Sequence, residues 1–104
     1  MVYIQEAHPS DKWQLPVNIR DSVVFANPRS TEERDAVAGT CVRNLGIEIP
    51  ALVDDMINST EKAYTGWPDR LYVIDREGKV DFKTAAGPFG FDPGNMEEAL
   101  KKLL

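Results

Sequence analysis

The first candidates for chemistry are a carboxylate and an imidazole two positions apart. Glu6 and His8, the sequence's only histidine, directly follow Val2–Gln5, which reads as a short β-strand. Residues two apart on an extended chain point to the same side, and α/β sheets bind ligands at the carboxyl ends of their strands. The pair could orient a substrate and pass a proton near neutral pH. A hydrogen-bonded pair that caps the loop fits the same pattern, so both interpretations remain open.

The only thiol, Cys41, is predicted to be structural. It falls in the middle of a helix expected from about Thr31 to Leu45, on an apolar stripe formed by Val37, Ala38, Cys41, Val42 and Leu45. A buried thiol with no positive charge beside it is normally inert. A single cysteine also excludes an intrachain disulfide, a CxxC pair and a cysteine-rich zinc site. We therefore expect no metal site and no cofactor.

A further group of candidate residues precedes the strongest strand-like run, Arg70–Asp75. Arg70 could hold a carboxylate or phenolate through two parallel hydrogen bonds, or form an exposed ion pair with Asp69. Trp67 packs around Pro68 or lines a pocket there. The sequence alone leaves these alternatives open.

Local signals predict the elements that position these residues, in the order β, loop, α, β, α, β, β, α. A capping box at Ser30–Glu33 begins the first helix and Gly46 ends it. Further strands are expected at 49–54, 70–75 and 79–83, the last two joined by a turn at Gly78. Short helices are expected from Asn58 and from about Asn95. Residues 7–29, with a brief extended piece at 23–25, read as a long irregular connection. This order indicates an α/β fold.

Length and charge restrict the function. The 104 residues fit a single domain spanning 1–104. Seventeen acidic residues against 12 basic ones give a net charge of −5, which disfavours nucleic acid and anionic membranes as partners. No apolar run approaches the roughly 20 residues of a membrane span, and the N-terminus does not resemble a signal peptide. A cytoplasmic location is expected.

Three segments, in order, resemble the iodothyronine deiodinase family and its bacterial relatives. Residues 3–13 are similar to the family segment Y-I-x-E-A-H-x-S-D-G-W, with Lys12 in place of the usual glycine. Residues 68–74 resemble its P-E-R-L-Y-I-I segment, and Gly87–Phe89 resembles its G-P-W/F segment. The resemblance covers nearly the whole chain.

This resemblance implies a partial thioredoxin-like fold, related to peroxiredoxins, with a cis peptide bond before Pro68. It implies reductive, thiol-dependent chemistry on a small molecule, such as removal of iodine. Supporting catalytic roles would fall to Glu6 and His8, and substrate-binding roles to Asp11, Trp13, Trp67, Pro68 and Arg70. A turn residue and a core aromatic are the structural alternatives for Asp11 and Trp13.

The resemblance also implies that the family's cysteine or selenocysteine nucleophile would precede Met1. We therefore expect the chain to correspond to the downstream part of such a domain, and to be inactive by itself. The alternative is a non-catalytic binding module that uses the Glu6/His8 pocket. A missing central strand would leave the edges at 2–5 and 70–75 unpaired and favour a homo-oligomer.

Overall fold

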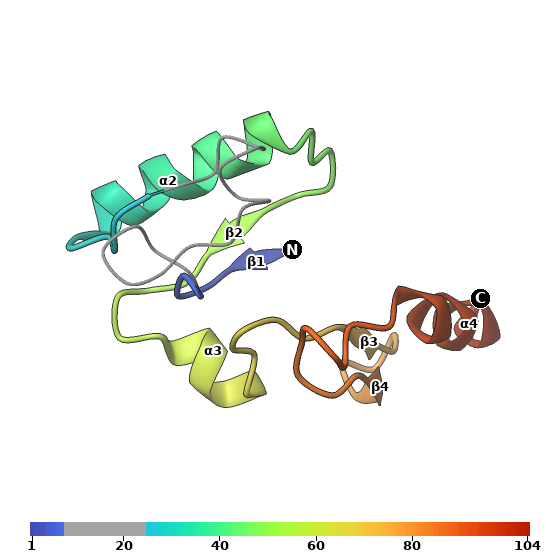
Figure 1. The fold of residues 1–104 in the computed structure, drawn as a ribbon. Helices are drawn as coiled ribbons and strands as arrows, with labels where there is room; N and C mark the ends of the chain where they lie inside the picture. The colour runs from blue at the N-terminus through green and yellow to red at the C-terminus, as the bar shows by residue number, and fades with distance from the viewer. Residues whose placement is uncertain (8–24) are drawn as a thin grey trace. The chain divides into compact units, whose positions relative to one another are not determined.

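The computed structural model describes residues 1–7 and 25–104. Over these residues the elements follow in the predicted order (Figure 1), namely β1 (Val2–Tyr3), α2 (Thr31–Asn44), β2 (Leu52–Val53), α3 (Ser59–Tyr64), β3 (Tyr72–Ile74), β4 (Val80–Lys83) and α4 (Pro93–Leu103). The chain divides into two compact units, Met1–Tyr64 and Thr65–Leu104. Each is a small sheet flanked by helix, so the predicted mixed α/β class is confirmed.

In the first unit, two short parallel strands lie beneath a helix (Figure 1). Val2 pairs with Leu52, and Tyr3 pairs with Val53. The Leu52 N–H donates to the Met1 carbonyl at 2.9 Å, and the Asp54 N–H donates to the Tyr3 carbonyl at 2.8 Å. Parallel strands need a crossover connection, and α2 is part of the chain between them. The β-α-β arrangement places α2 over one face of the sheet.

Local side-chain and backbone bonds define both ends of α2, as the sequence predicted. The Ser30 hydroxyl accepts the Glu33 N–H at 3.1 Å. The Glu33 carboxylate reaches back one residue further than a capping box requires, to the Arg29 N–H at 2.7 Å. At the other end, Gly46 has φ +65°. Its N–H donates to Arg43, and the Ile47 N–H donates to Val42, the paired bonds of a Schellman motif.

The predicted apolar stripe of α2 is only partly correct. Ala38 is buried, and Val37, Cys41 and Val42 are half-buried, but Leu45 is 49% exposed. Leu45 is the residue after the last helical turn, so its side chain leaves the face that packs on the sheet. Arg34 is buried instead. Its Nη1 donates to the Asp55 carbonyl at 2.6 Å and to Asn58 Oδ1 at 3.1 Å.

The buried carboxylate of Asp54 begins α3. Asp54 is 5% exposed, and its two oxygens accept the N–H groups of Thr60 and Glu61, each at 2.9 Å. Asp55 accepts the Ser59 N–H at 2.8 Å. The expected cap residue, Asn58, has φ +60° and does not cap the helix; its side chain bonds Gln5 instead. Asp54 is thus the cap that sequence reasoning did not identify.

The second unit is an antiparallel hairpin packed against the C-terminal helix. Val73 pairs with Phe82, and a register shift between Val73 and Ile74 brings Ile74 opposite Val80. The connecting turn is the predicted one: Gly78 has φ +81°, and Asp75 Oδ1 accepts the N–H groups of Glu77 and Lys79. Both strands contact α4, and Val73 is the buried apolar residue of this unit.

The last helix begins two residues earlier than predicted. Asp92 is its N-cap, because Asp92 Oδ1 accepts the Asn95 N–H at 3.1 Å, and Pro93 occupies the first turn. Proline suits this position because its missing N–H would have no partner there. Asp92-Pro93 is therefore the correct start signal, three residues before the predicted start at Asn95.

Asp54→Ala should destabilise the chain, since it removes the acceptor of two N–H groups at the start of α3. The expected loss in the free energy of unfolding is about 1–2 kcal/mol in urea titrations at neutral pH. Glu48→Ala, at an exposed position, is the matched control and should change stability by less than about 0.5 kcal/mol.

The same carboxylate predicts a pH dependence. Burial by itself would raise the pKa of Asp54, but the backbone N–H groups of Glu61, Thr60 and Asp55 hold this pKa below its usual value. Its contribution to stability is therefore complete above the unfolded value of about 3.9 and is lost as pH falls toward the folded pKa. The stability difference between the native sequence and Asp54→Ala should shrink between pH 5 and the acid limit, to about zero. A difference that stays constant with pH would contradict this account.

Candidate functional site

Glu6 lies where β1 has ended, and its carboxylate is enclosed by protein. Both carboxylate oxygens are buried, and neither has a hydrogen-bond partner among the described residues. An isolated buried carboxylate is costly, so such groups usually meet a partner or a ligand. Glu6 is thus one of the described acidic side chains, with Asp69, that keep a buried oxygen able to accept a hydrogen bond.

Tyr3 lies near both Glu6 and Cys41, the single cysteine of the sequence. Burial is the main reason why the pKa of Tyr3 is well above its usual value, and the nearby charge of Glu6 and the Cys41 thiol raise it further. The phenol therefore stays protonated at neutral pH and keeps its capacity to donate. Tyr3 and Cys41 meet because α2 lies over β1, a proximity that no local sequence pattern signals.

Cys41 has the properties of a structural thiol, as predicted. It is half-buried, and burial raises its pKa above the usual value. A hydrogen bond from Tyr3 acts in the opposite direction, while the charge of Glu6 raises the pKa again. Because the thiolate is the nucleophilic form, these surroundings keep Cys41 largely unreactive.

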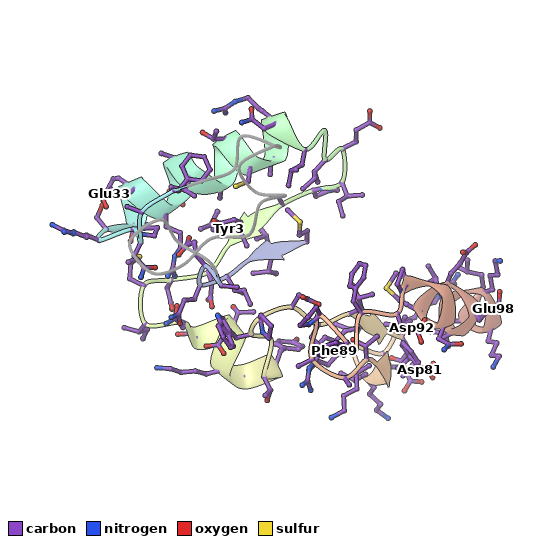
Figure 2. The ribbon with its side chains drawn as sticks, viewed as in Figure 1. Tyr3, Glu33, Asp81, Phe89, Asp92 and Glu98 are labelled. Carbon is purple, nitrogen blue, oxygen red and sulfur yellow. The ribbon has the colours of Figure 1, made fainter. Side chains whose placement is uncertain are left out.

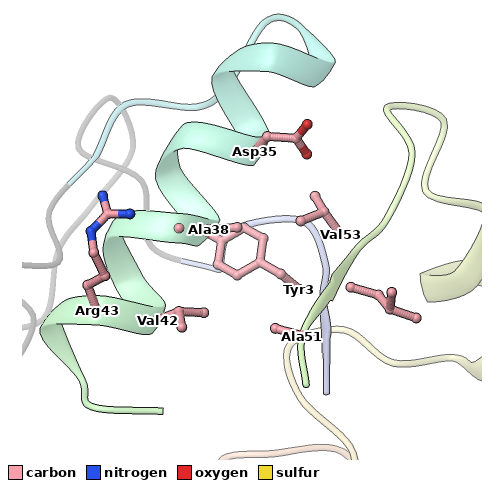
Figure 3. Close-up of a pocket in the computed structure, with 9 residues that line it drawn as sticks. Tyr3, Asp35, Ala38, Val42, Arg43, Ala51 and Val53 are labelled. Carbon is pink, nitrogen blue, oxygen red and sulfur yellow. The ribbon is translucent and has the colours of Figure 1, made fainter. Parts of the chain in front are cut away.

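A cavity of about 320 Å³ lies between α2 and the sheet of the first unit (Figure 3). The Tyr3 ring points toward α2 and forms part of its wall, and Asp35 and Arg43 are the charged residues that border it. The apolar lining comes from Ala38, Val42, Ala51, Leu52 and Val53. Tyr3 therefore lines this cavity, and it also lies near Glu6.

In the second unit, two cis prolines flank a buried carboxylate. The peptide bonds Trp67–Pro68 and Gly87–Pro88 are both cis, so the cis form expected before Pro68 is confirmed. The Gly87 N–H donates to the Asp69 carbonyl at 2.9 Å. A side chain at Gly87 would overlap the Asp69 carboxylate, so the glycine is needed for this close approach.

Asp69 and Arg70 keep polar atoms without a protein partner. Asp69 Oδ1 and Arg70 Nε are both buried and lack a hydrogen bond within the described part of the chain. Trp67, next to them, is largely exposed, and Phe89 on the following loop points into solvent (Figure 2). The arrangement offers one acceptor and one cationic donor to a ligand. Sequence reasoning had not selected Asp69 or Gly87 for the site.

The structure describes some of the predicted site residues, and those it describes lie in two different units. His8, Asp11 and Trp13 lie outside the described residues. Glu6 belongs to the first unit, whereas Trp67, Pro68 and Arg70 are brought together in the second. The catalytic and binding roles of all seven stay predictions.

No group of three acidic, histidine or cysteine side chains within 1–7 and 25–104 is arranged to hold a metal ion. None of the helices in that part of the chain is long and apolar enough to cross a membrane. The site, as described, offers hydrogen bonds and charge.

The elevated pKa of Cys41 predicts slow alkylation of the folded chain. Iodoacetamide should modify Cys41 at neutral pH more slowly in the folded chain than in urea, since a raised pKa lowers the thiolate fraction. Tyr3→Phe removes the hydrogen bond that lowers this pKa and should slow the reaction further. A folded thiol that reacts as fast as the unfolded one would contradict this account.

Comparison with known proteins identifies the family. The sequence model of the family Iodothyronine deiodinase matches residues 1–104. A type I iodothyronine deiodinase from Xenopus laevis is 32% identical over 102 residues, covering 98% of this chain and 38% of that protein. A thyroxine 5-deiodinase from Rattus norvegicus is 36% identical over 103 residues, covering 98% of this chain and 32% of that protein.

The human thyroxine 5-deiodinase is similar to the same extent, at 35% identity over 103 residues. The chain thus spans about a third of the length of the curated relatives it matches. The family has a thioredoxin-like fold, and the small sheets flanked by helices in this chain agree with it. The predicted partial thioredoxin-like fold is therefore confirmed. Because the family model matches this chain from its first residue to its last, the chain belongs to the iodothyronine deiodinase family.

Proposed function

We propose that this chain supplies the substrate-facing part of a deiodinase-like redox site. In such a reaction a C–I bond is replaced by a C–H bond and iodide leaves. Two thiols of a reductant are oxidised to a disulfide and supply the two electrons. Homologues named as thyroxine deiodinases support an iodinated aromatic molecule as substrate and a thiol as reductant. The observation that carries the proposal is the buried carboxylate of Glu6 near Tyr3, whose oxygens have no hydrogen-bond partner close enough among the described residues.

Within this site, Glu6 holds a polar hydrogen of the substrate. A carboxylate that accepts a hydrogen bond in an enclosed place binds more strongly than one in water. Tyr3 stays protonated, lies near Glu6 and forms a hydrogen bond with Cys41. His8 follows Glu6 in the sequence and completes the proposed set as the group that titrates near neutral pH. Arg70 belongs to the second unit, and there it could separately hold an anionic group of a ligand.

We further propose that the chain by itself does not turn over. The reaction needs a chalcogen nucleophile, and the sequence's single cysteine is Cys41. Its half-buried position and raised pKa are unsuited to attack on iodine. The chain would then need a nucleophile from elsewhere in order to be an oxidoreductase.

Iodide release from thyroxine in the presence of dithiothreitol tests this absence of turnover. The native chain and Cys41→Ser should both release iodide at the rate of the reductant alone. A rate above that background that Cys41→Ser abolishes would show that Cys41 is the nucleophile, and the proposal of an inactive chain would be wrong.

Glu6→Gln tests the binding half of the proposal. Loss of a charge-assisted hydrogen bond of roughly 1.5–3 kcal/mol should weaken thyroxine binding at least about tenfold, measured by quenching of tryptophan fluorescence. Glu48→Gln, at an exposed position, is the matched control and should bind normally. If neither the native chain nor the variants bind thyroxine, the proposed substrate is wrong.

The melting temperature of Glu6→Gln separates a binding role from a loop-capping role. Removing an unpaired buried charge should leave stability unchanged or raise it. A carboxylate that caps the loop would instead lower it when replaced. Weaker binding without loss of stability therefore favours the site.

A non-catalytic binding module is the second candidate function. The same unpartnered Glu6 oxygens support it, because a ligand can satisfy them without any reaction. Tight, Glu6-dependent binding of thyroxine with no turnover, even when a cysteine-containing partner is supplied, would favour this candidate.

We also propose that the chain self-associates through unpaired sheet edges.

A further inference from the structure

The cavity between α2 and the sheet of the first unit is large enough for a small molecule. Its volume is about 320 Å³. An apolar cavity of about 150 Å³ is enough to hold benzene, and ligand sites in proteins start at roughly 300 Å³. Small residues on both sides, Ala38 and Gly39 of α2 and Ala51 just before β2, leave this space open (Figure 3). The cavity thus has room for one ring and a short chain.

Gly39 is an unfavourable residue for its position in α2. It lies inside the helix, where glycine lowers helix stability relative to alanine. A Cβ atom at position 39 would stand 3.3 Å from Arg43 Nη1, closer than most side-chain atoms approach. The missing side chain therefore lets the Arg43 guanidinium lie close against its own helix at the border of the cavity.

The two charged residues at this border differ in the bonds that they already make. The Arg43 side chain runs back along α2, and its Nη2 donates to Thr40 Oγ1 at 3.2 Å. The Asp35 carboxylate, one turn before Gly39, accepts no hydrogen bond from residues 1–7 and 25–104. Figure 3 shows this carboxylate on the Val53 side of α2. Asp35 is therefore the charged group at the border that is free to receive a ligand.

An aromatic ring and a carboxylate together are groups that recognise organic cations. The Tyr3 ring forms part of the cavity wall (Figure 3), and the face of an aromatic ring attracts a cation within about 6 Å of its centre. A carboxylate accepts the charge-assisted hydrogen bonds of an ammonium group. The net charge of −5 also draws cations rather than anions to the chain. The charge of the cavity thus suits a cation with an apolar body.

We propose that this cavity binds a small primary ammonium ion that carries an apolar ring or short chain. The ammonium group donates to the Asp35 carboxylate. The apolar part of the ligand lies against Tyr3, Val42 and Val53, and its removal from water stabilises the complex. This site lies within the first unit, and the inference does not depend on the proposed redox function.

Three probes that share one ring test the charge and the apolar part of the ligand separately. Benzylamine is protonated at neutral pH, benzyl alcohol is its neutral counterpart, and benzoate carries the opposite charge. In amide NMR titrations, benzylamine should give saturable shifts at Ala38, Val42 and Val53, with a dissociation constant in the millimolar range. Benzyl alcohol and benzoate should each bind at least about tenfold more weakly. Tighter binding of benzoate, equal binding of the alcohol, or no saturation by benzylamine would each overturn the proposal.

Matched substitutions on α2 test which charge holds the ammonium group. Asp35→Asn keeps the shape of the side chain but removes its charge, and it should weaken benzylamine binding at least about tenfold. Glu32→Gln removes an exposed carboxylate of the same helix that does not line the cavity, and this control should bind as the native chain does. Arg43→Gln removes the neighbouring cation and should bind benzylamine as tightly or more tightly. If Arg43→Gln abolishes binding, the assignment to Asp35 is wrong.

Ala51→Leu tests the cavity itself, because the larger side chain occupies it from the sheet side. The benzylamine shifts should disappear while circular dichroism shows the chain folded. If Ala51→Leu and Asp35→Asn both bind benzylamine normally, this cavity is not the site. Asp35→Asn should also leave thyroxine binding unchanged, so failure of this inference is separate from failure of the proposed function. A parallel loss of thyroxine binding would place thyroxine in the same cavity, and the separate ammonium site would be wrong.

Discussion

Asp54 is the residue on which the first unit depends, because it bonds to two other elements. Its N–H extends the β1–β2 pairing to the Tyr3 carbonyl, and its carboxylate caps α3. Next to it, the Asp55 carbonyl accepts a hydrogen bond from buried Arg34 of α2. A strand pair with only two matched positions has little pairing energy of its own, and two-stranded sheets are marginal in water. These side-chain bonds therefore hold α2, the sheet and α3 in one arrangement.

The same arrangement determines what the candidate site can do. Because α2 lies over β1, Tyr3 is enclosed next to Cys41 and Glu6, and the enclosure raises the pKa of both Tyr3 and Cys41. A protonated phenol and a protonated thiol are poor nucleophiles but adequate donors. The Glu6 carboxylate, which has no hydrogen-bond partner within residues 1–7 and 25–104, is the complementary acceptor. The described part of the site can therefore offer hydrogen bonds to a ligand.

Both units cover one sheet face with their own helix and leave apolar side chains on the other. In the first unit these are Val2 and Leu52; in the second they are Ile74 and Val80, each about half exposed. The outer strands β2 and β4 carry charged residues or proline at or beside them, namely Asp81 and Lys83 on β4 and Pro50 and Asp54 beside β2.

The sequence by itself determined the local elements and the family. Ser30, Gly46 and Gly78 could be interpreted correctly because caps and turns are made by bonds between residues only a few positions apart. The motif segments at 3–13, 68–74 and 87–89 likewise indicated the deiodinase family, and Glu6 could be proposed from its place after the first strand. The start of α4 was missed by two residues only because two competing cap signals, Asp92 and Asn95, lie within one turn.

Only the tertiary structure decided which side chains share an environment. Arg34, which is not part of the predicted apolar stripe, is buried against the Asp55 carbonyl, and Asp54, expected as the end of a strand, is the cap of α3. Tyr3 belongs to a sequence motif but had no predicted role. The packing of α2 on β1 brings it near Glu6 and Cys41. These contacts join residues far apart in the chain, so their energies depend on how the helix packs on the sheet. Burial and pKa follow from that packing, which no local pattern of residues encodes.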